Sequence, residues 1–179
     1  MERVCCSYPV MLESFAAWLA GTSLTTFIEN EAWVVPTLQV THILSITIVT
    51  GAVAIMNLRI LGVIEQDQAI GALAARFVPP SAIALLVLAV TGFLLIAGEP
   101  TRAIFRYVFW AKMALLALAI LLSAGLLAGL SANGTATQPN ARAPVPYRIL
   151  AGLGLVIWLA IIVAGRWIGY AQGWPGSPQ

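Results

Sequence analysis

Four long apolar stretches dominate the pattern of hydrophobic and polar positions along the chain. From Pro36 to Leu58 no residue carries a formal charge, and at ~1.5 Å per residue this length crosses a ~30 Å hydrocarbon core. Backbone polar groups in lipid are satisfied only in helices or closed barrels, so these stretches predict an all-α polytopic membrane protein. Their short connections indicate one membrane domain over residues 1–179, an up-down four-helix transmembrane bundle. The predicted spans cover about residues 36–62, 80–98, 108–130 and 147–170.

The segment before the first span has a different pattern. Within residues 8–28, apolar side chains that include Phe15 and Trp18 recur at helical spacing, but Gly21 and several Ser and Thr residues interrupt the run. This segment is too short and too polar to cross a bilayer. It is predicted to be an interfacial amphipathic helix, with Trp18 and Phe15 at the headgroup boundary.

Clusters of Pro, Gly and polar residues predict where the connections between spans and the C-terminal tail lie. A short surface helix over residues 69–77 is expected to end at the Pro79–Pro80 pair, before the second span. Residues 131–144 are rich in Ser, Thr, Asn and Pro and predict a loop. Residues 171–179 are expected to be disordered.

Composition supports a membrane location and excludes other classes. The chain is 60% hydrophobic and only 9% charged, where a soluble domain carries about 25% charged residues. The net charge of +2 is scattered, without a basic run or a phosphate-cradling glycine loop, so membrane lipids and not nucleic acids are the expected partners. Cys5 and Cys6 are adjacent, which gives no Cys-x-x-Cys or Cys/His spacing, and no metal site is predicted.

Basic residues give a weak indication of orientation. An even number of spans places both termini and the 98–107 loop on one side, and the two sides carry five and four basic residues. Lys112 is expected within a span and Arg3 lies far from any span, so neither is included in the count of basic residues on the side of the termini. The 65–79 and 131–146 loops are therefore placed in the cytoplasm, with the termini on the periplasmic side of a bacterial inner membrane.

The only histidine lies inside the first span, about 10 Å from its start. Antiparallel packing brings Lys112 and Glu99 to the depth of His42, and Gln39 shares the face of His42, so these four residues are predicted to form a polar cluster, with Thr91 nearby. Glu99 is expected to pair with Lys112, because an isolated charge in lipid is costly. In the alternative, Lys112 extends to the headgroups and His42 hydrogen-bonds to a carbonyl group.

A single histidine supplies only one strong ligand for a haem or a metal ion. A b-type haem on His42 would need Met113 as second ligand, a symmetric dimer, a partner subunit or a five-coordinate iron, and copper on these two residues would be a poor site. At the opposite end of the spans, Arg59 and Arg148 are expected to contact lipid headgroups, or to bind an anionic ligand such as cardiolipin between them. No catalytic residues are predicted, because the chain has no Ser/His/Asp set and no paired intramembrane carboxylates.

Several short sequence motifs resemble those of a known family. Two tryptophans, Trp18 and Trp33, precede a His42-Ile43-Leu44 start, and the first span closes on Asn57-Leu58-Arg59-Ile60-Leu61-Gly62. Two further motifs are Ala97-Gly98-Glu99-Pro100 at the end of the second span and Trp110-Ala111-Lys112 at the start of the third. Over roughly residues 12–130 the chain resembles a bacterial domain-of-unknown-function family of small four-helix integral membrane proteins, which implies the architecture and no activity. It is more faintly similar to copper-resistance-type and cytochrome-like membrane bundles, which have more histidines.

Three functions are compatible with these features. The leading interpretation is a non-catalytic accessory or structural subunit of a larger inner-membrane assembly, formed with other membrane subunits or as a homo-oligomer. The second is a haem- or metal-binding redox subunit, or a quinone- or proton-linked one, that uses His42. The third is a small-solute carrier acting as an oligomer, which four spans without broken helices or inverted repeats make less favoured.

Overall fold

The computed structural model describes residues 10–98, 100, 104 and 107–170. The described residues are helical without strands, which confirms the all-α class. Glu99, the adjacent cysteines and the tail predicted to be disordered lie outside this range. The elements are α1 (Val10–Ala20), α2 (Ser23–Asn30), α3 (Val34–Leu61), α4 (Ile70–Gly98), α6 (Tyr107–Ala132), a 3-10 turn η1 (Thr135–Thr137) and α7 (Val145–Tyr170).

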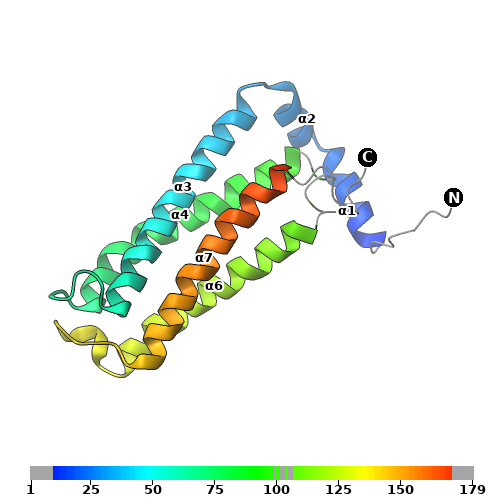
Figure 1. Ribbon diagram of the computed structural model, residues 1–179. Helices are drawn as coiled ribbons and strands as arrows, with labels where there is room; N and C mark the ends of the chain where they lie inside the picture. The colour runs from blue at the N-terminus through cyan, green and yellow to red at the C-terminus, as the bar shows by residue number, and fades with distance from the viewer. Residues whose placement is uncertain (1–9, 99, 101–103, 105–106, 171–179) are drawn as a thin grey trace.

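Four of these helices, α3, α4, α6 and α7, are long and apolar enough to cross a membrane, so the chain is a multi-pass membrane protein. Helix α3 packs against α4 and α7, and α7 packs against α6 (Figure 1). Helices α4 and α6 are not packed against one another along their length. The bundle therefore has the spatial order α4–α3–α7–α6, and its two outer helices have few close backbone contacts with one another.

Helix α3 ends in a glycine cap. Gly62 adopts a left-handed conformation with φ of 78°, and its N–H points to the carbonyl groups of Leu58 and Arg59. The N–H of Val63 also donates to the Leu58 carbonyl oxygen, at 3.0 Å. Glycine reaches this conformation without a Cβ penalty, so the Arg-Ile-Leu-Gly sequence stops the helix at this point.

The predicted break at Pro79–Pro80 is not found. Residues assigned to a surface helix and to the second span form one helix, α4, with both prolines inside it. Proline removes a backbone donor, but inside a membrane neighbouring helices and Ser or Thr hydroxyl groups compensate for this loss. The carbonyl groups that lose a backbone donor are those of Ala75 and Arg76, four residues before each proline, and the hydroxyl of Ser81 donates to the next carbonyl oxygen, that of Phe77, at 2.7 Å.

The N-terminal segment forms two helices instead of the single one predicted. Gly21 and Thr22 separate α1 from α2, and Thr22 caps α2 by accepting from the backbone N–H of Thr25 at 3.4 Å. Both helices lie at the end of the bundle where α7 ends (Figure 1). Leu19 and Ile28 pack with residues of α3 and α4 in a small core cluster, while Trp18 stays 65% exposed.

Two further core clusters lie between the spans. The central one joins Val49, Ala84, Ala119, Ile157, Trp158 and Ile161. The other lies at the end farthest from α1 and includes Ala136 of η1, so the predicted 131–144 loop folds back on the bundle. An added Cβ on Gly71 of α4 would lie 3.0 Å from the Ala136 carbonyl oxygen, which shows how closely this loop approaches α4.

Candidate functional site

His42 of α3 is joined to Thr91 of α4 by a hydrogen bond inside the bundle. The distance from Nδ1 of His42 to Oγ1 of Thr91 is 2.8 Å, and Thr91 is only 5% exposed. The Thr91 hydroxyl also donates to the Val87 carbonyl oxygen of its own helix at 2.7 Å. Since a hydroxyl has one hydrogen, Thr91 then accepts from Nδ1–H of His42, which leaves the lone pair of the neutral imidazole on Nε2.

Two glycines make room for the polar side chains at this level. A Cβ on Gly92 would lie 3.4 Å from Cε1 of His42, so the imidazole packs directly on the α4 backbone. A Cβ on Gly165 of α7 would lie 3.4 Å from Nζ of Lys112, which is half-buried. Lys112 of α6 is also near enough to His42 for the two to interact electrostatically. All four spans thus contribute to one polar layer, defined here as His42, Thr91 and Lys112 with the two glycines.

The other residues predicted for this cluster lie differently. Gln39 is exposed, one turn before His42, and Glu99 is outside the described residues. Met113, predicted as a second haem ligand, is 43% exposed and follows Lys112 directly in α6. Among the described residues, no group of three or more His, Cys, Asp and Glu side chains is placed to hold a metal ion.

At the opposite end of α3, the guanidinium of Arg59 joins two loops. Arg59 is 2% exposed, with Nε donating to the Gln68 carbonyl oxygen at 2.9 Å and Nη2 to that of Gln66 at 3.2 Å. Longer contacts of 3.4 and 3.5 Å reach the Ala141 carbonyl oxygen in the loop between α6 and α7. The charge lies in the last helical turn, where it complements the helix dipole.

This burial differs from the predicted headgroup contact of Arg59. The loop carbonyl groups occupy the donors that a phosphate would need, because both connecting loops fold over the end of the bundle. Arg148 is exposed, and its contact with headgroups stays a prediction. The role of Arg59 was missed in the sequence, where the only signal is an arginine between apolar residues just before a glycine cap.

A comparison with protein families identifies the chain's relatives. The model of a family of unknown function, DUF6644, matches residues 15–171. The chain belongs to this family. The match includes all four spans and every residue of the polar layer, and it confirms the expected domain-of-unknown-function resemblance. No curated protein and no solved structure matches the chain.

Proposed function

We propose that this member of the family is a non-catalytic subunit of a larger membrane assembly, and that it docks through one face of α6. This surface, called the small-residue face, is a single helical stripe with spacings of three and four residues. It consists of Ala114, Ala117, Leu121, Gly125 and Ala128.

The small-residue face is open in the structure. All five of its residues are exposed, and a Cβ on Gly125 would meet no atom within 4 Å. Helix α6 is also the least buried of the four spans, since only 17% of its most apolar stretch is buried inside the protein. This unused face is the observation on which the proposal depends.

Small residues favour helix association in lipid. Lipid tails are as apolar as leucine, so transmembrane helices associate through close van der Waals packing, which small side chains permit. On this face Leu121 is 70% exposed and stands between small residues, as a knob that a facing helix can surround. The facing helix belongs to another subunit or to a second copy of the chain, in a bacterial inner membrane with the termini on the periplasmic side.

The proposal predicts that enlarging Gly125 disrupts the complex, whereas enlarging Gly51 does not. Blue-native electrophoresis of the mildly solubilised, tagged protein at native expression should show a species larger than 19.0 kDa. Gly125→Leu should remove it, because the added side chain blocks close approach. Gly51→Leu is the matched control, because Gly51 of α3 is equally open. A lone 19.0 kDa species in the natural protein, or equal loss in both variants, would contradict the docking face.

A second candidate function uses the polar layer to bind a haem or metal, or to take part in proton-linked chemistry. The hydrogen bond that His42 donates to Thr91 orients the ring and leaves Nε2 of His42 as the coordinating or proton-accepting atom, as outer partners of ligating histidines do. Visible absorption and metal content of the purified protein test this candidate. A Soret band lost in His42→Ala would support it, and a colourless, metal-free preparation would count against cofactor binding.

A further inference from the structure

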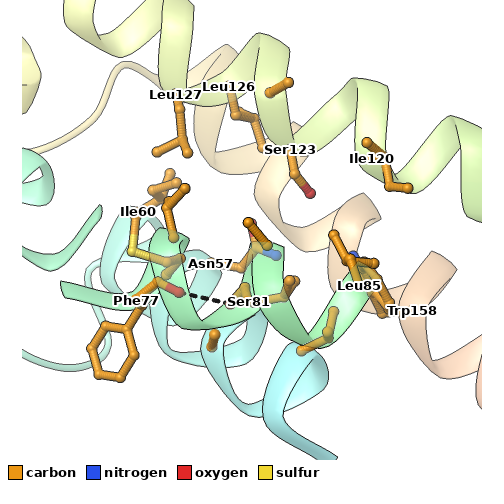
Figure 2. Close-up of a pocket in the computed structure, with 17 residues that line it drawn as sticks. Asn57, Ile60, Phe77, Ser81, Leu85, Ile120, Ser123, Leu126, Leu127 and Trp158 are labelled. Carbon is orange, nitrogen blue, oxygen red and sulfur yellow. Dashed lines mark hydrogen bonds between the residues drawn. The ribbon is translucent and has the colours of Figure 1, made fainter. Parts of the chain in front are cut away.

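An apolar cavity of about 250 Å³ lies inside the bundle, in the half away from α1 (Figure 2). Residues of all four spans line it, and no charged side chain is among them. The hydroxyls of Ser81 and Ser123 donate to carbonyl groups one turn earlier in their own helices. The indole Nε1 of Trp158, which has no hydrogen-bond partner among the described residues, is itself buried and adds almost no polar surface. The wall of the cavity is therefore almost entirely hydrocarbon.

The mouth of the cavity is formed by α4 and α6. The lining residues on α3 and α7 are buried or half-buried, whereas four on the other two helices are exposed, namely Val78 and Ala82 on α4 and Ile120 and Ala124 on α6. All four belong to helices long and apolar enough to cross a membrane, so their exposed side chains face lipid. The cavity therefore opens laterally toward the hydrocarbon core of the bilayer and not toward water.

Arg76 directly precedes the part of α4 that lines the cavity. It is exposed, and it is the only charged residue of this helix. The 22 uncharged residues from Phe77 to Gly98 extend over about 33 Å, close to the ~30 Å thickness of the hydrocarbon core. Arg76 therefore marks the headgroup level, and the cavity begins immediately below it.

The guanidinium of Arg76 lies over an aromatic ring that belongs to the cavity wall. Its Cζ is 5.7 Å from the centroid of the Phe77 ring, and Phe77 lines the cavity. Stacking on a ring leaves the N–H groups in the guanidinium plane pointing sideways, where they can donate to a phosphate in a bidentate manner. A cation suited to a phosphate and an apolar space suited to a chain are thus adjacent on one helix.

We infer that this is a phospholipid site, in which the phosphate binds Arg76 and one acyl chain enters the cavity between α4 and α6. Apolar cavities stay dry, so without a guest the lining side chains lack van der Waals partners. The volume exceeds the roughly 150 Å³ of a cavity that holds benzene, which leaves room for part of a chain. Along α4 the lining extends from Phe77 to Leu85, about 12 Å below the phosphate, a depth through which the chains of the same lipid pass.

Two other occupants match only part of this arrangement. A neutral hydrocarbon fits the cavity but makes no use of Arg76, and a side chain of a docked subunit fills the mouth without a phosphate. A molecule with polar groups in its buried part would lose its hydrogen bonds against the hydrocarbon wall. A phospholipid uses both the cation and the cavity.

The test uses a phosphatidylglycerol with a diazirine in the middle of one acyl chain. The purified full chain in phospholipid-free detergent micelles is titrated with this probe, irradiated and analysed by peptide mass spectrometry. Met56 of α3 should give an adduct that saturates, because it lines the cavity and is only 8% exposed, out of reach of lipid around the bundle. Val156 of α7, which is 63% exposed, should be labelled without saturation.

Two pairs of variants separate the chain site from the phosphate site. Ala82→Phe obstructs the mouth and should abolish the Met56 adduct, whereas Ala89→Phe, two turns further on the same exposed face, should leave it unchanged. Arg76→Gln should raise the half-saturating concentration of the phospholipid about fivefold, but not that of a diacylglycerol with the same diazirine chain. Arg142→Gln removes another exposed arginine and should change neither value.

Three results would overturn the inference. The first is labelling of Val156 without labelling of Met56, and the second is equal loss of the Met56 adduct in the two phenylalanine variants. The third is a half-saturating concentration that is the same for the phospholipid and the diacylglycerol, or that Arg76→Gln leaves unchanged, since hydrocarbon alone would then account for binding.

Discussion

Replacing Arg59 tests whether its guanidinium holds the two loops at the end of the bundle. Its two shortest hydrogen bonds, to the carbonyl groups of Gln66 and Gln68, are charge-assisted, and each such bond contributes about 1.5–3 kcal/mol. The longer contacts to Ala141 are weaker bonds, and they are the ones that join Arg59 to the loop between α6 and α7. Arg59→Met keeps the apolar stem but leaves these acceptors unpaired, so we expect it to lower the free energy of unfolding by about 3–5 kcal/mol.

The assay has a global and a local readout. Unfolding by SDS titration in mixed micelles, followed by helical circular dichroism, gives the change in free energy. Trypsin cleavage after Arg142, an exposed residue beside Ala141, should become faster when Arg59 no longer holds the loop. Arg59→Lys should lose about 2 kcal/mol, because a lysine keeps the charge but not the planar fork.

Arg148→Met is the matched control, because Arg148 is exposed at the same end of the bundle. It should change stability by less than about 0.5 kcal/mol. If Arg59→Met lowers stability by less than about 1 kcal/mol, or leaves cleavage after Arg142 unchanged, the guanidinium does not stabilise these loops.

Other substitutions test the contacts between spans. Thr91→Val should lower stability by about 1 kcal/mol, the typical net value of one hydrogen bond, and Thr91→Ser should not; equal stability of the two variants in SDS titration would refute the contact with His42. Gly129→Ala places a Cβ 2.7 Å from the ring of Tyr147 and should cost about 1–3 kcal/mol. Gly125→Ala meets no atom within 4 Å and should be neutral or stabilising by up to about 1 kcal/mol, so a similar loss in both glycine variants would contradict the α6–α7 packing.

The spans could be predicted because a bilayer demands long uncharged helices, a requirement visible in sequence. The Pro79–Pro80 pair gave the wrong boundary, because the rule that proline ends a helix applies best in water. Ending and restarting the helix in lipid would leave several backbone N–H and carbonyl groups without partners, more than the two donors that the prolines remove, so continuing α4 through both prolines is favoured.

The two ends of α3 differ in how well their sites could be predicted. The common level of His42, Thr91 and Lys112 was expected from the depth of each residue in an antiparallel bundle; in the structure His42 contacts Thr91, and Lys112 is within electrostatic range of His42. The burial of Arg59 could not be predicted, because it depends on how two loops fold over the bundle end. The free Trp158 N–H is equally invisible in sequence, since an apolar run does not show which donors lack acceptors.

Site-specific photocrosslinking in native membranes tests the proposed docking of α6 most directly. A benzophenone side chain at Leu121 should give an adduct larger than the 19.0 kDa chain, because this position lies at the centre of the small-residue face. The same probe at Val156, which is 63% exposed on α7, should contact lipid and give no protein adduct. Only the 19.0 kDa band from the Leu121 probe, or identical adducts from both positions, would contradict the account.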